Sequence, residues 1–297
     1  MTDETAETQA EDGVQNHGDE SPPAGRRSRT APTVAVAARE LRSTMRSTGG
    51  LLFGAGLTIA IVGVAYAGEG YRSSYLATTA DLLAALSVLV PVVAVAFGYR
   101  TLLSDARSGE LDVLSTYPVA AWQHVLGAYL GRAIPLSAVV LVPFMAVAGL
   151  VSVSTAPEAS VFATHAGADS PILFARLAAL TLLYALVALA VGVAVSAVAT
   201  SARVGIALSV GAVVVIVLVA DLAIVGGLAS GALGGESIHG ALALSPASAF
   251  RGLVFETVIS AAGGAGPETA SVPASLAGLS AWLLGSLAVA VAALRLR

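Results

Sequence analysis

LAALTLLYALVALAVGVAVSAVATSARVGIALSVGAVVVIVLVADLAIV, residues 177–225, is the stretch that decides the fold class. It contains two long apolar runs, Leu177–Ala199 and Val204–Val225, which are separated only by residues 200–203. A helix needs about 20 apolar residues to cross a bilayer, and each run is long enough. Because the connection is so short, the two helices must be antiparallel neighbours. The stretch therefore predicts a transmembrane helical hairpin.

Four more apolar runs extend this pattern over the rest of the chain, at Gly50–Gly68, Leu82–Tyr99, Val125–Val151 and Ser275–Leu294. The whole chain is 56% hydrophobic and 11% charged. Soluble domains, by comparison, carry about 25% charged residues. We therefore expect an all-α integral membrane protein with six transmembrane helices, in one membrane domain over residues 32–297.

The N-terminal 31 residues have a different composition. Residues 1–23 contain no basic residue but seven acidic ones: Asp3, Glu4, Glu7, Glu11, Asp12, Asp19 and Glu20. A polar segment of this kind has too few apolar side chains to form a core. We predict that residues 1–31 are a disordered acidic tail on the cytoplasmic side. The acidic, lysine-free composition of the chain also resembles that of proteins from salt-loving archaea.

All 15 basic residues are arginine, and the chain has neither lysine nor cysteine. A phosphate-binding Walker A loop requires a lysine, and so does Schiff-base catalysis. Disulfides and thiolate chemistry require cysteine. The histidines, at positions 17, 124, 165 and 239, lie outside the predicted spans without metal-ligand spacing. We interpret them as solvated loop residues, and we expect no catalytic site, metal site or cofactor in this chain.

The arginines predict the orientation, because cytoplasmic loops of membrane proteins are enriched in positive charge. With both termini inside, three arginines face outward, namely Arg72, Arg176 and Arg251. Eleven then face the cytoplasm: Arg26, Arg27, Arg29, Arg39, Arg42, Arg46, Arg100, Arg107, Arg203, Arg295 and Arg297. The opposite orientation would reverse this bias, so we predict that the N- and C-termini are both cytoplasmic.

Two segments outside the predicted spans have the pattern of helices at the membrane surface. In residues 34–46, one helical face is apolar (Val34, Ala38, Leu41, Met45) and its flank carries arginines (Arg39, Arg42, Arg46). This pattern favours an amphipathic helix in the interface, with arginine stems that reach the headgroups. Ala247–Ser260 is apolar, but it is short and contains Arg251 and Glu256. We predict a shallow re-entrant or interfacial helix there.

Two ionisable residues fall within or near the spans, where such residues are functional candidates. Arg132 lies inside the third span, and we expect its side chain to reach back to the cytoplasmic surface. Asp221 follows Arg203 by 18 residues, roughly 27 Å along a helix, which places it near the outer interface. Neither has an obvious buried partner in the sequence, so the pattern does not favour a proton relay.

Residues 97–132, FGYRTLLSDARSGELDVLSTYPVAAWQHVLGAYLGR, connect the second and third spans. Ser104 can cap a short helix that has Asp105 in its first turn. Gly109 allows a change of direction, and Pro118 suits the first position of the third span. The segment therefore predicts a short cytoplasmic helix between the two spans.

The exposed face of this short helix is suited to protein contact. Leu111 and Leu114 form an apolar edge, and Arg107, Glu110 and Asp112 are charged neighbours. Such a helix can dock in the groove of another protein and move two spans together. An ordinary ordered loop is the alternative interpretation.

The same segment resembles the characteristic motif of ABC-2 type transporter permeases, in particular the NosY-like group of copper-enzyme maturation systems. The matching residues are Gly98, Tyr99, Asp105, Gly109, Leu111, Leu114, Ser115, Tyr117, Pro118, Val119, Gly127, Leu130, Gly131 and Arg132. Residues 38–46 resemble the family's amphipathic N-terminal helix, and residues 244–254, LSPASAFRGLV, resemble its stretch before the last span. The chain departs from the family pattern at Arg107, Glu110 and Ala128, where the family has an acid, a threonine and a lysine.

The resemblance implies that residues 32–297 form the permease subunit of an ATP-driven transporter in the cell membrane. Separate ATPase subunits would bind ATP and magnesium, and the permease would pair with a second copy or a related chain. No nucleic acid is implied. The residues implied in coupling to the ATPase are Ser104, Asp105, Arg107, Gly109, Glu110, Leu111, Leu114, Tyr117 and Pro118. Structural or interface roles are implied for Arg39, Arg42, Arg132, Pro246 and Arg251.

Three other functions stay open as alternatives. A secondary transporter would need intramembrane acids or broken helices in inverted repeats. An intramembrane enzyme would need paired catalytic groups within the spans. A non-transporting scaffold or assembly factor would not show stimulation of a partner ATPase by cargo. Because the spans carry few polar residues, export of a hydrophobic or lipid-like cargo is the expected activity.

Overall fold

The computed structural model describes residues 31–45, 48–103, 120–154, 170–231, 237–263 and 271–296. All nine residues predicted to couple to an ATPase fall in residues 104–119, outside the described residues. Nearly all of the predicted acidic tail also falls outside them, since the description begins at residue 31. The described ranges are helical throughout, apart from turns and caps.

Six helices in the described ranges are long and apolar enough to cross a membrane, as predicted. They are α2 (Thr48–Gly68), α3 (Tyr75–Gly98), α6 (Ala121–Ser154), α7 (Pro171–Val198), the composite helix Ala202–Ala229, and α13 (Val272–Arg295). Several begin earlier than their apolar runs. In α3, the hydroxyls of Thr78 and Thr79 donate to carbonyls one turn back. Polar residues at this end therefore fit into the helix, which begins beyond the Ser74 cap rather than at Leu82.

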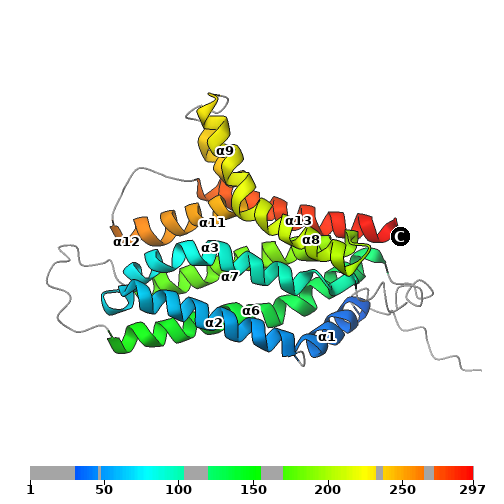
Figure 1. Ribbon diagram of the computed structural model, residues 1–297, viewed down its shortest axis with the longest axis horizontal. Coiled ribbons are helices and arrows are strands. Elements are labelled where there is room, and N and C mark those ends of the chain that lie inside the picture. The colour runs from blue at the N-terminus through cyan, green and yellow to red at the C-terminus, as the bar shows by residue number, and fades with distance from the viewer. Residues whose placement is uncertain are drawn as a thin grey trace, which may run out of the picture.

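The helices form an elongated bundle in which α2, α3, α6 and α7 run side by side (Figure 1). Helix α7 is the centre of the bundle, since it packs against α3, α6 and α13 and is the most buried of the spans. The N-terminal helix α1 (Ala31–Met45) and the end of α13 lie at the same end of the bundle (Figure 1). The first and last described helices therefore end on one side of the bundle, which the arginine distribution predicts to be the cytoplasmic side.

Helices α3 and α7 touch at two glycines. A Cβ atom on Gly98 would lie 2.7 Å from the carbonyl carbon of Gly192, and one on Gly192 would lie 2.8 Å from the carbonyl oxygen of Val95. These distances are too short for any side chain, so the two backbones touch. Close packing of small residues is a main source of helix association in lipid, where apolar side chains gain little from burial. Gly98 belongs to the motif between the second and third spans, whereas Gly192 carried no signal of its own in the sequence.

The fifth span is not straight. Helix α8 (Ala202–Val214) lies along α3, a π-helical turn η3 (Val215–Val219) follows, and α9 (Ala220–Ala229) leaves the bundle near its middle (Figure 1). A π-helical turn shifts the register of a helix and allows a bend. The predicted depth of Asp221 was therefore wrong. The prediction took the distance from Arg203 to Asp221 along the helix as the distance across the membrane. Because the helix bends at η3, Asp221 does not lie that far across the bundle.

The segment between the fifth and sixth spans enters the bundle. It contains α10 (Ser237–Leu244), α11 (Pro246–Val254), the π-helical turn η4 (Phe255–Ile259) and α12 (Ser260–Gly263). The Phe250 ring stacks on Tyr184, with centroids 4.8 Å apart, and the Tyr184 hydroxyl donates to the Ser87 carbonyl. Tyr184 and Ser87 lie near the middle of α7 and α3.

The predicted re-entrant helix is therefore present, but it is deep rather than shallow. Its buried face, which includes Phe250, Leu253 and Val258, packs into the core of the bundle. Arg251, adjacent to Phe250, consequently lies at mid-depth and not in an outer loop as predicted. Without Arg251, only Arg72 and Arg176 remain of the three arginines that were predicted to face outward. The excess of arginines predicted for the cytoplasmic side is therefore larger.

The contact between Gly98 and Gly192 predicts that a side chain at either position destabilises the bundle. In Gly98→Val, the added atoms should cost about 1–3 kcal/mol, as overpacking of a filled core does. The measurement is the temperature at which heated, detergent-solubilised protein loses its monodisperse size-exclusion peak. Gly63→Val is the control, because nothing lies within 4 Å of a Cβ at Gly63. Equal losses in both variants would contradict the assigned contact.

Candidate functional site

The described residues on both sides of the 104–119 segment are anchored in the bundle. On the N-terminal side, Thr101, Leu102 and Leu103 are buried. The amides of Leu102 and Leu103 donate to the Ser196 hydroxyl oxygen at 2.8 and 2.9 Å. Ser196 is itself fully buried near the end of α7. The chain is therefore fixed to α7 directly before the segment that the sequence assigns to coupling.

On the C-terminal side, the chain enters α6 with a side-chain cap. The Ala120 amide donates to the Gln123 side-chain oxygen at 2.9 Å, which satisfies one of the free amides at a helix start. Gln123 and His124 are both buried. The interpretation of His124 as a solvated loop residue was therefore wrong, because α6 begins at Ala121 and carries His124 into the packed part of the bundle.

Arg132 joins three helices at this end of the bundle. Its Nε donates to the Glu40 carboxylate of α1 at 3.0 Å, and its Nη1 donates to the Phe97 carbonyl of α3 at 2.5 Å. The Arg132 side chain is 16% exposed and the Glu40 side chain 6%. Arg132 was predicted to lack a buried partner and to reach back to the surface. It is instead held inside the protein, because α1 supplies the carboxylate.

Helix α1 packs directly onto α6 through glycines. A Cβ on Gly127 would lie 2.8 Å from the Thr33 carbonyl oxygen, and one on Gly131 would lie 2.6 Å from that of Ala37. Their four-residue spacing puts both glycines on one face of α6 and lets the two backbones touch. The embedded face of α1 therefore consists of Thr33, Val36, Ala37 and Glu40.

The predicted apolar face of α1 is a second, separate face. Val34 is exposed, and Leu41 is only partly buried. Arg39 and Arg42 are both exposed, although Arg39 also contacts the Glu40 carboxylate at 3.2 Å. An amphipathic surface helix is thus present, but it rests on protein on one side and presents its apolar and arginine-bearing sides outward. The sequence prediction missed the embedded face that packs on α6. Its signal in the sequence was Glu40, a single acid among several arginines.

A second polar cluster lies where α9 leaves the bundle. The Asp221 carboxylate accepts hydrogen bonds from the hydroxyls of Ser245 at 2.5 Å and Ser248 at 2.7 Å, and it pairs with the Arg251 guanidinium. Asp221 and Arg251 were both predicted to lie at the outer side, and Asp221 had no obvious partner in the sequence. They pair because the deep re-entrant helix and the bent fifth span meet at the same depth.

The N-terminus of α11 is built to face this carboxylate. Ser245 caps the helix by accepting from the Ser248 amide, and Pro246 occupies the first helical position. The free amides of a helix start carry partial positive charge, so a nearby carboxylate is stabilised. The Trp282 indole also donates to the Leu244 carbonyl at 2.9 Å, which ties the segment to α13. Pro246 and Arg251 thus hold the second cluster together.

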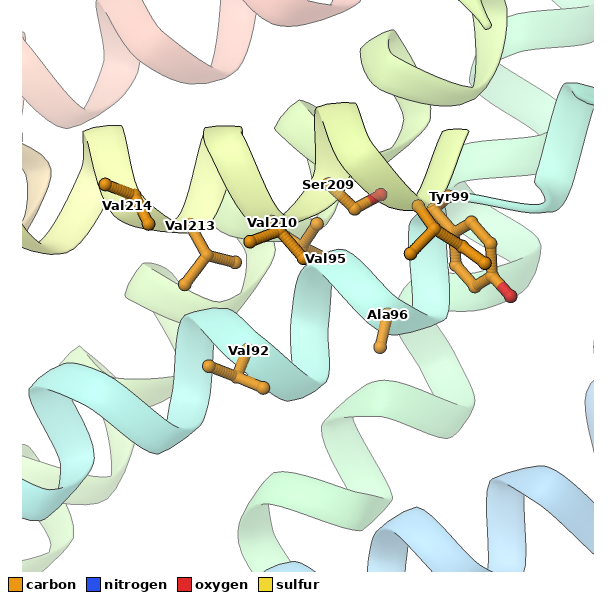
Figure 2. Close-up of a pocket in the computed structure, with 9 residues that line it drawn as sticks. Val92, Val95, Ala96, Tyr99, Ser209, Val210, Val213 and Val214 are labelled. Atoms are coloured by element: carbon orange, nitrogen blue, oxygen red, sulfur yellow. The ribbon is translucent and has the colours of Figure 1, made fainter. Parts of the chain in front are cut away.

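An apolar groove runs between α3 and α8. Its volume is about 390 Å³, and Val92, Val95 and Ala96 on α3 face Val210, Val213 and Val214 on α8 (Figure 2). Tyr99 and Ser209 supply its few polar atoms at one end. Within the described ranges, no three histidine, aspartate or glutamate side chains are grouped as metal ligands. The described residues therefore offer two ion-paired junctions and an apolar groove.

The Glu40–Arg132 pair predicts that α1 loosens when the arginine is neutralised. Removing one partner of a buried ion pair costs about 3–5 kcal/mol. If about a third of this cost favours detachment of α1 from α6, the population of the detached state rises roughly tenfold. In Arg132→Gln, trypsin should therefore cleave after Arg39 and Arg42 about ten times faster, measured by mass spectrometry of the fragments. Arg203→Gln, exposed at the start of α8, should leave both rates unchanged. Identical rates in both variants would refute the locking role.

The second cluster predicts energetic coupling between Asp221 and Arg251. Asp221→Asn and Arg251→Gln should each lower stability, and the double variant should lose less than the sum, by about 0.5–3 kcal/mol. Unfolding by SDS in mixed micelles measures these differences. Arg176→Gln provides the control, because its guanidinium donates to the Thr257 carbonyl and its effect should add to that of Asp221→Asn. Additivity in both pairs would show that the ion pair carries no coupling.

The comparisons with known proteins agree with this architecture. Residues 34–296 match the family described as ABC-2 family transporter protein. The chain is 29% identical over 228 residues to the probable ABC transporter permease protein NosY of Pseudomonas aeruginosa, covering 76% of this chain and 80% of that protein. It is 33% identical over 86 residues to the protein of the same name from Stutzerimonas stutzeri, covering 29% and 31% of the two chains. The chain therefore belongs to the ABC-2 family of transporter proteins, as a multi-pass permease subunit of the cell membrane.

Proposed function

We propose that this chain moves its cargo across the membrane with energy from ATP hydrolysed by two separate ATPase subunits. The observation that carries this proposal is the double anchoring of residues 104–119. One end of the segment is fixed to α7 through Ser196, and the other enters the capped, buried start of α6. A force applied to the segment from the cytoplasm would therefore reach the centre of the bundle. ATP and magnesium would be bound by the partner subunits.

In this proposal, residues 104–114 form the coupling helix, seated in a groove of the ATPase. Leu111 and Leu114 supply its apolar edge, and Asp105, Arg107 and Glu110 set its charge pattern. Ser104 caps the helix, Gly109 permits the turn, and Tyr117 and Pro118 lead into α6. Closure of the ATPases on ATP would tilt α3 and α6 together. The tilt would extend to α1, because Arg132 joins α1, α3 and α6.

We further propose that the permease works as a dimer, with a second copy or a related chain. The fifth span supports this arrangement, since it is among the least buried of the spans. Leu218, Leu222 and Val225 are exposed where the helix leaves the bundle. A partner helix packed there would cover these side chains and enclose a pathway between the two protomers.

The cargo is proposed to be hydrophobic or lipid-like and to be exported. The apolar lining of the groove between α3 and α8 supports this choice (Figure 2). Polar or charged cargo would require more hydrogen-bonding groups along its route than this surface provides. We also infer from the acidic, lysine-free composition that the chain comes from a salt-loving archaeon. In such a cell, molar salt shortens the Debye length to about 3 Å, so docking of the ATPase would depend on short-range contacts.

The coupling role is tested by two substitutions in the proposed helix. Leu111→Asp removes its apolar edge, and Glu110→Arg inverts its charge. Both should abolish co-purification of a co-expressed ABC ATPase and ATP-driven transport, while the size-exclusion profile stays that of the unmodified protein. Two differently tagged copies of the permease should still co-purify, since the proposed dimer contact lies elsewhere.

Arg72→Gln is the matched control, because Arg72 lies in the turn at the opposite end of the bundle. This variant should keep both ATPase binding and transport. Normal ATPase binding and full transport in Leu111→Asp and Glu110→Arg would refute the coupling assignment. If the ATPase binds but no hydrophobic cargo stimulates its activity, a non-transporting scaffold would replace the transporter.

A further inference from the structure

A cavity of about 360 Å³ lies at the bundle end that carries both chain ends, in the angle between α1 and α2. Ser43 of α1 and Gly49 of α2 form one side, and Tyr99 and Arg100, which directly follow α3, lie on the other. Arg132 of α6 lines its inner end. The cavity is large enough for a small polar group such as a phosphate-bearing headgroup.

This cavity is positively charged. The Arg100 guanidinium lies 5.8 Å from the centre of the Tyr99 ring, so the ring face orients it. Arg132 is neutralised in part by Glu40, but within the described residues its Nη2 atom makes no hydrogen bond. Arg42, exposed on α1, directly precedes Ser43 of the cavity. The charge therefore favours an anionic occupant.

A second cavity, of about 220 Å³, lies next to the first, since Gly50 and Phe97 line both. Its remaining walls are apolar and include Leu41 of α1, Leu51 of α2, and Ile134 and Ala138 of α6. Leu51, Ile134 and Ala138 are exposed, so this slot opens on the side of the bundle rather than into its core. Its lining suits a hydrocarbon chain and no polar group.

The two cavities together have the polarity of one amphiphile. The arginine-lined part lies among the end of α1, the start of α2 and Arg132 of α6. The apolar slot lies between the start of α2 and residues 134–139 of α6, further along α6 from its cytoplasmic start than Arg132. The arginine bias assigns this end of the bundle to the cytoplasm, where anionic lipids attract basic segments. We propose that the paired cavities bind an anionic phospholipid of the cytoplasmic leaflet, with its headgroup phosphate at Arg100 and one acyl chain in the slot.

A lipid in this position would touch every helix that meets at Arg132. Its headgroup would contact the ends of α1 and α3, and its chain would lie between α2 and α6. Soluble phosphate could satisfy the arginines alone, but it would leave the apolar slot unexplained. A zwitterionic lipid could fill the slot, but it would gain little from the arginines. The site therefore requires both parts of an anionic lipid.

The test titrates the detergent-solubilised full chain with phosphatidylglycerol or with phosphatidylcholine that has the same acyl chains. Native mass spectrometry counts the lipids retained and measures the affinity of the first. One phosphatidylglycerol should bind per chain, well ahead of phosphatidylcholine, and a millimolar excess of glycerol phosphate should not displace it. Equal retention of the two lipids, or full displacement by glycerol phosphate, would overturn the proposal.

Substitutions in each part of the site sharpen this test. Arg100→Gln should weaken phosphatidylglycerol binding about fivefold, as expected for roughly 1 kcal/mol per basic residue at an anionic lipid surface. Arg100→Lys keeps the charge and should retain most of the affinity. Ala138→Trp fills the slot and should also weaken binding, whereas Ala146→Trp should not.

Ala146→Trp and Arg203→Gln serve as matched controls. Ala146 is exposed on the same helix as Ala138, two turns beyond the slot. Arg203→Gln removes an exposed arginine that lies outside both cavities. Unchanged affinity in both Arg100→Gln and Ala138→Trp would refute the site. If Arg100→Gln fails to give a monodisperse peak, Ala138→Trp against Ala146→Trp decides the outcome.

Discussion

The C-terminal end of α3 is the point on which the rest of the structure depends. The last carbonyls of a helix have no intrahelical partner, and in a bilayer no water replaces one. The Phe97 carbonyl accepts from Arg132, a cation that also complements the negative end of the helix. The next residue, Gly98, allows the backbone of α7 to touch α3. One helix end thereby fixes three others: α6, α7 and, through Glu40, α1.

This junction lies directly before the segment that the family resemblance assigns to coupling. After Gly98, the amides of Leu102 and Leu103 donate to the Ser196 hydroxyl oxygen, and the chain then enters residues 104–119. It returns through the Gln123 cap into the same helix that carries Arg132. Both ends of the segment are thus connected to the same few contacts. The arginine-lined cavity opens beside them, which places the proposed lipid at the mechanical centre of this end.

The pair formed by Asp221 and Arg251 is a second junction with a different physical basis. Ionisable groups at mid-depth are costly, and they persist where they pair with each other and with neighbouring polar groups. Here Ser245 and Ser248 satisfy the carboxylate further, and the start of α11 faces it. The cluster holds together the two irregular parts of the fold, the bent fifth span and the re-entrant helix. The junction at Arg132 connects regular helices, whereas the pair of Asp221 and Arg251 stabilises the bent and re-entrant parts of the fold.

Apolar run length was sufficient to place all six spans, because the bilayer imposes one minimum length on every crossing helix. The re-entrant helix was also recognisable, since Ala247–Ser260 is apolar but too short to span. Its depth was not, because depth depends on the helix against which Phe250 stacks. The bend at η3 had no proline or glycine pair to announce it, so the position of Asp221 was misjudged.

By itself, the sequence determined that this chain is a helical membrane protein with six spans and a basic surface helix. Only the tertiary structure decided which residues meet. Glu40 and Arg132 are 92 residues apart, and Asp221 and Arg251 are 30 apart. The reason is physical, since a spanning helix is apolar on every side whether it faces lipid or protein. Its apolar pattern therefore indicates that the helix lies in a membrane, but not which helices pack against it. Contacts between small residues and between buried charges decide which helices become neighbours.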